Sequence, residues 1–270
     1  MERDSSEDTE FISLPMIDYV NITANKDRAS INRDPLVSII IVVYNGVSTI
    51  RDSIESVINQ TENHEIIIID GASTDGTLSV LEEYQERLTY LLSEPDSGIY
   101  DAMNKGLNIA KGEWIYFLGA DDVMLPGIIN SMKHILLGDK YALVFGNIKY
   151  SNGKVFKSSI SLKTILQNTL HHQSAFYRRN LFNDFKFNTG FKILSDYELN
   201  LLIYLKKLPY LNKNILIAEC MVGGSSFNTN LSLKETNQIR KLHVNKFLNF
   251  NLTWLLTFKY YINYVLLRKV

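Results

Sequence analysis

The sequence predicts an α/β fold, with a mostly parallel central sheet, flanking helices and a helical tail at the carboxyl end. The first observation is the run VSIIIVVYN at 37–45, whose continuous β-branched apolarity indicates a strand buried on both faces. The second is alternation: HEIIIID at 64–70 precedes a helical pattern at 77–87, and LTYLLSE at 88–94 leads into the next helix. Three such units in series predict parallel strands joined by right-handed crossovers.

Three segments are expected along the chain. Residues 1–34 are polar without a sustained hydrophobic period, which predicts a flexible or loosely docked extension. Residues 35–230 form the α/β domain, in which the Asn-Gly step at 152–153 indicates a hairpin between two strands. Residues 231–270 have a helical, aromatic-rich pattern with a basic end. Two interpretations of this tail stay open: a helix packed on the domain, or an interfacial helix lying on a membrane.

Composition excludes several classes of protein. The 270-residue chain has a formal net charge of −1, so no nucleic-acid partner is expected. One cysteine, Cys220, rules out an internal disulfide and fits a reducing compartment. The start MERDSSEDTEF lacks the features of a secretory signal, and no apolar stretch reaches the roughly 18 residues of a spanning helix. A cytoplasmic protein is expected, with peripheral membrane contact through the tail as the alternative that the interfacial helix implies.

Two adjacent acids, Asp121 and Asp122, follow the apolar run EWIYFLG at 113–119. Ligands of open α/β sheets bind beyond the carboxyl ends of the strands, where these acids are expected to lie. A carboxylate pair there suits Mg²⁺ or Mn²⁺, which share their remaining positions with water and substrate phosphates. The pair therefore predicts a metal-assisted site for a diphosphate-bearing substrate. The alternative is a solvated turn before a helix.

The helix before that strand presents a polar face. Asp101, Asn104 and Lys105 are spaced i, i+3 and i+4, which places an acid, an amide and a cation side by side. Such a face suits the polar groups of a nucleotide-sugar, and a solvated face with one ion pair is the other interpretation. Gly98, before the helix, permits close approach of the backbone to a ligand.

These segments occur in an order that resembles a known family. VSIIIVVYN, IIIID with GASTDGT, EPDSGIYDAMNKGLNIAKGEWIYFLGADD, HHQSAFYRR and SDYEL follow one another as in the family 2 glycosyltransferases of GT-A fold. The similarity covers about residues 35–226, and GIYDAMNKG resembles a subgroup that includes colanic-acid-type transferases of bacterial polysaccharide biosynthesis. The resemblance implies a Rossmann-like GT-A domain and an inverting, metal-dependent hexosyl- or N-acetylhexosaminyltransferase.

The resemblance also implies roles for individual residues. It assigns the nucleobase edge to Asp70, and a tyrosine after the first strand can lie against the base. The donor-binding residues expected on this ground are Tyr44, Asn45, Asp70, Asp96, Gly98, Asp101, Asn104, Lys105 and Asp121.

The metal is assigned by the resemblance to Asp122, the last acid of the Asp-X-Asp element, with His172 as a candidate further ligand. Ala120 replaces the first acid of that element, which leaves fewer carboxylates for Mg²⁺ or Mn²⁺. Asp196 in SDYEL is the expected catalytic base, since inverting transfer needs a carboxylate beside the acceptor hydroxyl and a helix start keeps it ionised. The alternative for Asp196 is a helix cap, a role that Ser195 would otherwise take.

The expected function is therefore transfer of a sugar, with inversion, from a nucleoside-diphosphate sugar, UDP favoured, to a glycan or lipid-linked acceptor. The expected place is the cytoplasm or the cytoplasmic face of the inner membrane. Two other functions stay open. A dinucleotide-dependent oxidoreductase would need a G-x-G-x-x-G after the first strand, where the chain has Tyr44, Asn45 and Gly46. A catalytically degenerate protein that binds sugars or partner proteins is the other.

Overall fold

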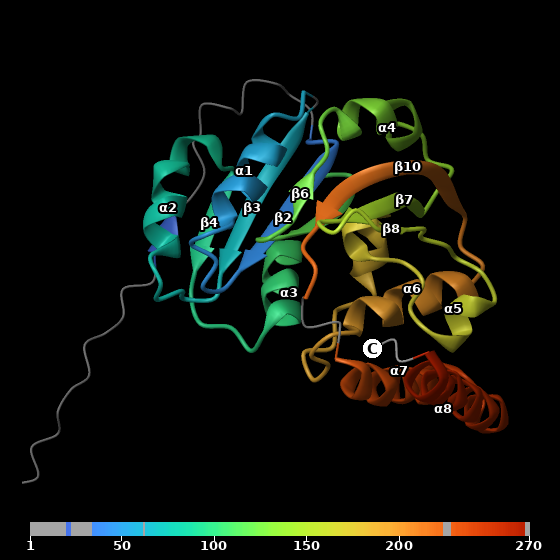
Figure 1. Ribbon diagram of the computed structural model, residues 1–270. Helices are drawn as coiled ribbons and strands as arrows, with labels where there is room; N and C mark the ends of the chain where they lie inside the picture. The colour runs from blue at the N-terminus through green and yellow to red at the C-terminus, as the bar shows by residue number, and fades with distance from the viewer. Residues whose placement is uncertain (1–19, 23–33, 62, 224–227, 268–270) are drawn as a thin grey trace, which may run out of the picture.

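The computed structural model describes residues 20–22, 34–61, 63–223 and 228–267 (Figure 1). A twisted central sheet runs through the domain in the order β1-β4-β3-β2-β5-β9-β7-β10-β6, and β8 pairs with β7. The strands are β1 (Val20–Ile22), β2 (Val37–Val43), β3 (His64–Asp70), β4 (Tyr90–Ser93), β5 (Trp114–Gly119), β6 (Val123–Met124), β7 (Leu143–Tyr150), β8 (Val155–Phe156), β9 (Ala175–Arg178) and β10 (Tyr210–Cys220). The helices are α1 (Ile50–Ile58), α2 (Thr77–Glu83), α3 (Ile99–Ile109), α4 (Ile128–Leu136), α5 (Lys163–Leu166), α6 (Ser195–Leu205), α7 (Thr229–His243) and α8 (Lys246–Leu267).

Strand β2 lies at the centre of the parallel half of the sheet, as its continuous apolar run predicts. It pairs in parallel with β3 and β5, and all seven of its residues are buried. Ile39 and Ile41 face the core that α1 and α4 cover, whereas Ile40 and Val42 face the core that α3 and α6 cover. The strands β4, β3, β2 and β5 are parallel, so their carboxyl ends share one edge of the sheet.

The other half of the sheet makes it mixed. Strand β9 lies between β5 and β7 and is antiparallel to both, while β10 is parallel to β7 and antiparallel to the short β6. The hairpin predicted at 152–153 is confirmed by the antiparallel β7–β8 pair and by Gly153, whose φ of 82° needs glycine. The α/β fold class is thus confirmed, with antiparallel strands added beyond β5.

Strand β1 comes from the amino-terminal extension and pairs antiparallel with β4 at the edge of the sheet. The prediction of a flexible extension otherwise falls on residues 1–19 and 23–33, which lie outside the described residues.

The tail forms two helices at the base of the domain (Figure 1). Helix α7 packs on α6, and α8 packs on α7 and α5. One side of α8 faces the domain, where Leu256 is buried, and the opposite side is exposed. Within the described part of the chain, no helix is both long and apolar enough to cross a membrane.

Candidate active site

Asp70 ends β3 at the carboxyl edge of the parallel strands and is completely buried. Its carboxylate accepts hydrogen bonds from the Ser73 backbone N–H at 3.1 Å, from the Ser73 hydroxyl and from the Ser93 hydroxyl at 2.5 Å. Asp70 therefore fixes the loop after β3 and ties it to β4. Its contact with a nucleobase stays a prediction.

The loops after β2, β3 and β4 meet around Gly71. A Cβ atom at Gly71 would lie 2.5 Å from Oδ2 of Asp96 and 3.4 Å from the ring of Tyr44, so a larger residue there would displace the Asp96 carboxylate. Tyr44 is 65% exposed, which leaves its ring open to a ligand. Asn45 joins the first two loops, because its side-chain oxygen accepts from the Thr74 backbone N–H at 2.9 Å. Tyr44, Asn45 and Asp70, three of the predicted donor-binding residues, thus lie together at the carboxyl edge of the parallel strands.

The remaining predicted donor-binding residues before β5 are engaged with the protein itself. Asp96 and Asp101 accept backbone N–H bonds within their own loop, Asp96 from Gly98 at 2.8 Å. Lys105 pairs with Glu94 at 2.8 Å and reaches Asp101 at 3.9 Å. Asn104 contacts Phe187 instead: its side-chain amide donates to the Phe187 carbonyl and accepts from the Phe187 backbone N–H.

Asp121 and Asp122 follow β5 directly and fold back over Gly119. A Cβ atom at Gly119 would lie 2.6 Å from an oxygen of Asp122 and 3.0 Å from one of Asp121, so a larger residue at the end of the strand would displace both carboxylates. Asp121 is exposed, whereas Asp122 is 4% exposed. The two acids therefore lie together with very different access to water.

Two hydrogen bonds hold Asp122: one from Nε2 of Gln173 at 2.8 Å and one from the backbone N–H of Met221 at 3.2 Å. Burial raises the pKa of the Asp122 carboxyl, and the neighbouring Asp121 raises it further. A cation beside Asp122 would relieve both effects.

The residues around Asp122 fit a divalent cation that is shared with a substrate. Oε1 of Gln173 is buried, and within the described residues it has no hydrogen-bond partner, which supplies an unused amide oxygen beside the carboxylate. The described residues contain no group of three or more histidines, cysteines and acids placed to hold a metal. A Mg²⁺ or Mn²⁺ ion here would therefore take most of its ligands from water and a diphosphate.

Asp196 lies in the first turn of α6 and is 6% exposed. The groups around its carboxylate are the Tyr197 backbone N–H at 2.9 Å, the Tyr100 hydroxyl at 3.3 Å, Nδ1 of His172 at 3.3 Å and Nδ2 of Asn168 at 3.4 Å. Neither Asp196 nor Ser195 caps α6, because the N-cap residue is Leu194 and no side chain makes a cap bond. The Ser195 hydroxyl instead accepts from the Asn188 backbone N–H at 2.7 Å.

A short 3₁₀ turn, His172–Ser174, connects the two predicted acids. Gln173 reaches Asp122, and its neighbour His172 reaches Asp196. Asp122 and Asp196, 74 positions apart in the sequence, are thus linked through two adjacent residues, and their membership of one site stays a prediction. His172 faces Asp196 through Nδ1, and its role as a metal ligand stays a prediction.

A cavity of about 220 Å³ opens beside Asp196. His171, His172 and Asp196 form one part of its lining, and Leu256 and Tyr260 of α8 form another. Burial lowers the pKa of His171 to about 4, so this imidazole is neutral at physiological pH and contributes shape and a hydrogen bond to the Tyr150 hydroxyl.

Glu235 of α7 is a residue of this site that sequence reasoning missed. It is buried, and its carboxylate accepts backbone N–H bonds from Lys192, Ile193 and Leu194 at 2.7–3.1 Å. These three residues lead directly into the turn that carries Asp196. Gln173 was also missed as a partner of Asp122, although its place in HHQ, beside His172, was a signal. Nothing in the sequence around Glu235 indicates its role.

Replacing Glu235 by Gln should lower the free energy of unfolding by about 2 kcal/mol, because an amide NH₂ would face backbone donors that now share two carboxylate oxygens. Chemical denaturation measures the change. The matched control is Glu83→Gln, which removes a carboxylate that is paired with Arg51 at the surface and should change little. Equal stability of the two variants would contradict a stabilising role for the hydrogen bonds that Glu235 accepts from residues 192–194.

Comparison with known proteins agrees with this geometry. The family model described as Glycosyl transferase family 2 matches residues 38–198. A relative from Mycobacterium bovis, a PGL/p-HBAD biosynthesis glycosyltransferase, is 32% identical over 176 residues, which cover 62% of this chain and 69% of that protein.

Two solved structures share the fold. S. aureus TarS 1–349 in complex with UDP-GlcNAc matches with a TM-score of 0.62 and 19% identity, over 82% of this chain and 71% of that one. The mannosyltransferase PcManGT from Pyrobaculum calidifontis, in complex with GDP-Man and Mn²⁺, matches with a TM-score of 0.60 and 18% identity, over 79% and 66%. Asp121 and Asp122 directly follow strand β5, within the residues that the family model matches. Because that model covers more than half of the chain, the chain belongs to glycosyl transferase family 2.

Proposed function

We propose that this glycosyltransferase moves a sugar from a nucleoside-diphosphate sugar, with a UDP-sugar favoured, to a glycan or lipid-linked acceptor with inversion at the anomeric carbon. The observation that carries the proposal is the turn at 172–174, which brings Gln173 to Asp122 and His172 to Asp196. In this proposal, Asp122 serves the diphosphate side of the donor and Asp196 serves the acceptor side.

Asp196 is the proposed catalytic base. As the acceptor oxygen attacks the anomeric carbon, its proton passes to the Asp196 carboxylate, the new C–O bond forms, and the bond to the diphosphate breaks. His172, Tyr100 and Asn168 orient the carboxylate through the contacts described above. The cavity beside Asp196 is the proposed entry for the acceptor.

Asp122, with the amide of Gln173, is the proposed ligand of Mg²⁺ or Mn²⁺, whose charge would offset that of the leaving diphosphate. The raised pKa of Asp122 and the unpartnered amide oxygen support this role. The Mn²⁺ and GDP-Man in the PcManGT structure and the UDP-GlcNAc in TarS support a nucleotide-sugar donor with a divalent metal.

The proposed setting is bacterial cell-surface glycan synthesis at the cytoplasmic face of the membrane, with a hexose or N-acetylhexosamine as the transferred sugar. The name of the mycobacterial relative, a PGL/p-HBAD biosynthesis glycosyltransferase, supports a role in a biosynthetic pathway, and the lipid-linked acceptor is part of the proposal. Contact of the tail with a membrane is part of the same proposal.

A screen of nucleotide-sugars tests the function. We expect one donor, most readily a UDP-sugar, to raise the melting temperature in the presence of Mn²⁺ and to release its nucleoside diphosphate slowly by hydrolysis. EDTA should remove both signals. A folded protein that gives no thermal shift and no nucleotide release with any UDP-, GDP- or dTDP-sugar would overturn the proposal in favour of a degenerate binding protein.

A further inference from the structure

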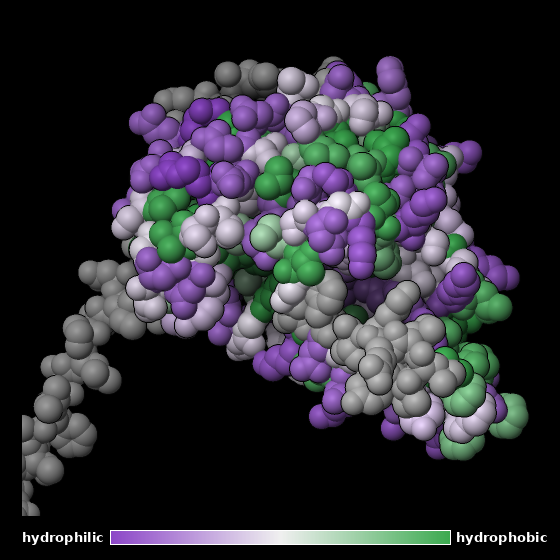
Figure 2. All heavy atoms as spheres, viewed as in Figure 1, coloured by the Kyte–Doolittle hydropathy of each residue, from purple (hydrophilic) through white to green (hydrophobic). Residues whose placement is uncertain are grey.

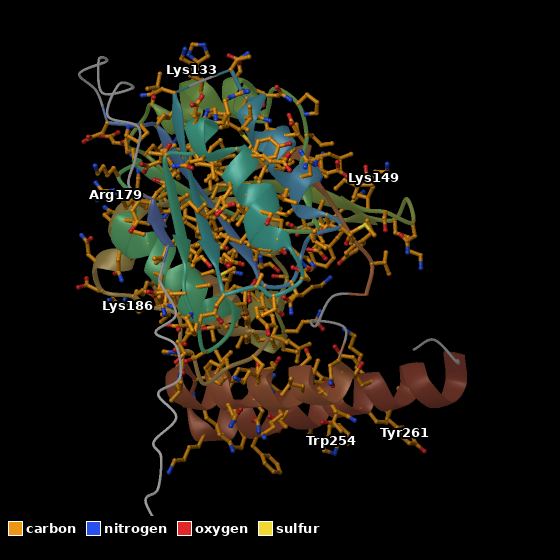
Figure 3. All side chains as sticks on the ribbon, turned by 90° about the vertical axis from the view of Figure 1, so that its left-hand side faces the viewer. Lys133, Lys149, Arg179, Lys186, Trp254 and Tyr261 are labelled. Carbon is orange, nitrogen blue, oxygen red and sulfur yellow. The ribbon has the colours of Figure 1, made fainter. Side chains whose placement is uncertain are left out.

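Helix α8 carries a stripe of aromatic side chains on its outer side, defined by Phe247, Phe250, Trp254, Phe258 and Tyr261. Their spacing of three and four residues places them on one face, and they are 47–82% exposed. Apolar side chains gather at the lower right of the molecule in Figure 2, where Figure 1 places α8. Figure 3 shows Trp254 and Tyr261 on the side of α8 away from the sheet. Within the described residues, no other element covers this aromatic stripe.

A basic pocket lies between α7 and α8, beside the aromatic stripe. This cavity of about 420 Å³ is lined by Lys234, Arg240 and Lys241 together with polar groups such as Asn237 and Thr257, and no acid is among its lining residues. Lys234 and Lys241 are exposed at its mouth. Cations and hydrogen-bond donors without a carboxylate are the chemistry of a phosphate site.

Arg240 is the unusual member of the basic pocket, because it is completely buried. Its guanidinium donates to the Leu166 carbonyl at 2.8 Å and to the side-chain oxygens of Thr253 and Asn249 at 2.9 and 3.1 Å. All three acceptors are neutral, and within the described residues no carboxylate lies within ion-pair distance. Burying a cation without an anion is unfavourable, so a phosphate in the pocket would stabilise it.

The charge of the tail helps to decide whether a second copy of the chain or a membrane covers the aromatic stripe. Residues 236–270 contain no Asp or Glu but six cations: Arg240, Lys241, Lys246, Lys259, Arg268 and Lys269. Of these cations, Lys241, Lys246 and Lys259 are exposed in the described part of the tail. A second copy of the chain, packed stripe to stripe about a two-fold axis, would bring two surfaces of like charge together. A membrane containing anionic lipid offers the opposite charge and a headgroup layer that suits Trp and Tyr.

We infer that α7 and α8 form a docking surface for anionic membranes, in which the aromatic stripe lies at headgroup level and the basic pocket binds a lipid phosphate. The inference deepens the proposed function, on which it rests for a lipid-linked acceptor. Leu233 and Leu256 line both the basic pocket and the cavity beside Asp196, so the two adjoin. Docking would thus hold the acceptor cavity against the lipid surface.

Tryptophan fluorescence tests the docking directly. Of the two tryptophans, Trp114 is completely buried and Trp254 is 65% exposed, so a change in emission on docking reports Trp254. We expect a blue shift and co-sedimentation with vesicles of phosphatidylcholine and phosphatidylglycerol in equal parts. With phosphatidylcholine alone, binding should be much weaker, and added salt should weaken binding to the mixed vesicles. No shift and no co-sedimentation with the mixed vesicles would overturn the inference.

Two variants separate the parts of the surface. Lys234→Gln with Lys241→Gln should weaken binding to the anionic vesicles roughly 25-fold, from about fivefold per cation. The matched control, Lys111→Gln with Lys140→Gln, removes two exposed lysines outside the tail and should bind as the parent does. Trp254→Ser with Phe258→Ser should weaken binding to both kinds of vesicle. Equal loss in the two lysine variants would overturn the basic pocket.

Two further measurements address the other occupants. Light scattering without lipid should give a monomer for the parent. If the parent is a dimer and the Trp254→Ser, Phe258→Ser variant is a monomer, a second copy covers the stripe and the inference is overturned. Free glycerol phosphate that saturates the lysine-dependent site without any vesicle binding would assign the pocket to soluble phosphate instead. Donor hydrolysis in solution should be the same in all variants, so failure of docking is distinguishable from failure of the proposed function.

Discussion

Replacing Asp196 by Asn is expected to reduce sugar transfer by about 10²–10⁴-fold, the range that loss of a general base produces. Donor binding should persist, because the donor-side residues around Asp70 and Asp122 are untouched. Asn keeps the shape of the side chain and can accept from the Tyr197 backbone N–H. Its amide can also pair with His172 in the other tautomer. Steady-state kinetics should therefore show a loss in kcat with little change in the donor KM.

The control for this variant is Glu198→Gln, which lies in the same turn of α6 and pairs with His243 at 2.6 Å outside the site. It should retain transfer. Thermal unfolding of both variants separates catalysis from folding, since Asp196→Asn should melt within a few degrees of the parent. A variant that transfers sugar at the parental rate would contradict the role of Asp196 as the base. An equal loss of transfer in Asp196→Asn and Glu198→Gln would also contradict that role.

The parallel half of the fold was predictable because each of its elements carries a local signal. The run at 37–45 has no polar alternation, and β2 is buried on both sides. Position along the chain then implies neighbouring strands, since consecutive βα units usually lie side by side.

The antiparallel half depends on pairings that no local pattern encodes. Ala175–Arg178 is apolar enough for a strand, but its insertion between β5 and β7 depends on which edges remain after the parallel half has formed. The same holds for β6, only two residues long, which exists because β10 passes beside it. Local periodicity predicts the state of a segment but not its neighbour.

The candidate site likewise contains residues that the sequence indicated and residues that it did not. Asp122 and Asp196 were recognisable from their motifs, and their connection through His172 and Gln173 agrees with a single cleft. Glu235 was not recognisable, because its partners are backbone N–H groups about 40 positions earlier. The tail had two interpretations, and α8 combines features of both: one side packs on the domain, and the other carries the aromatic stripe.

Replacing Asp122 by Asn is expected to have opposite effects on activity and stability. Activity should fall at least about a hundredfold, because the charge that would hold the metal at the diphosphate is lost. The melting temperature of the metal-free protein should rise, since burial and Asp121 both disfavour the ionised carboxylate. Asn can adapt to the same surroundings: its oxygen can accept from the Met221 N–H, and its NH₂ can donate to Oε1 of Gln173 after the Gln173 amide, whose Nε2 now faces Asp122, turns over.

The pH dependence fixes the sign of this stability effect. A carboxyl whose pKa is raised on folding destabilises the native state only as pH rises above its unfolded value, here near the ordinary 3.8. The gain from Asp122→Asn should thus be small in acid and increase toward neutral pH. Asp139→Asn, at an exposed loop position, should show no such trend. With saturating Mn²⁺ and donor the order should reverse, because in the proposed role only the parent would bind the metal tightly, and ligand binding would stabilise the parent. A variant less stable than the parent at neutral pH without metal would mean that the hydrogen bonds from Gln173 and Met221 outweigh the desolvation of the Asp122 charge.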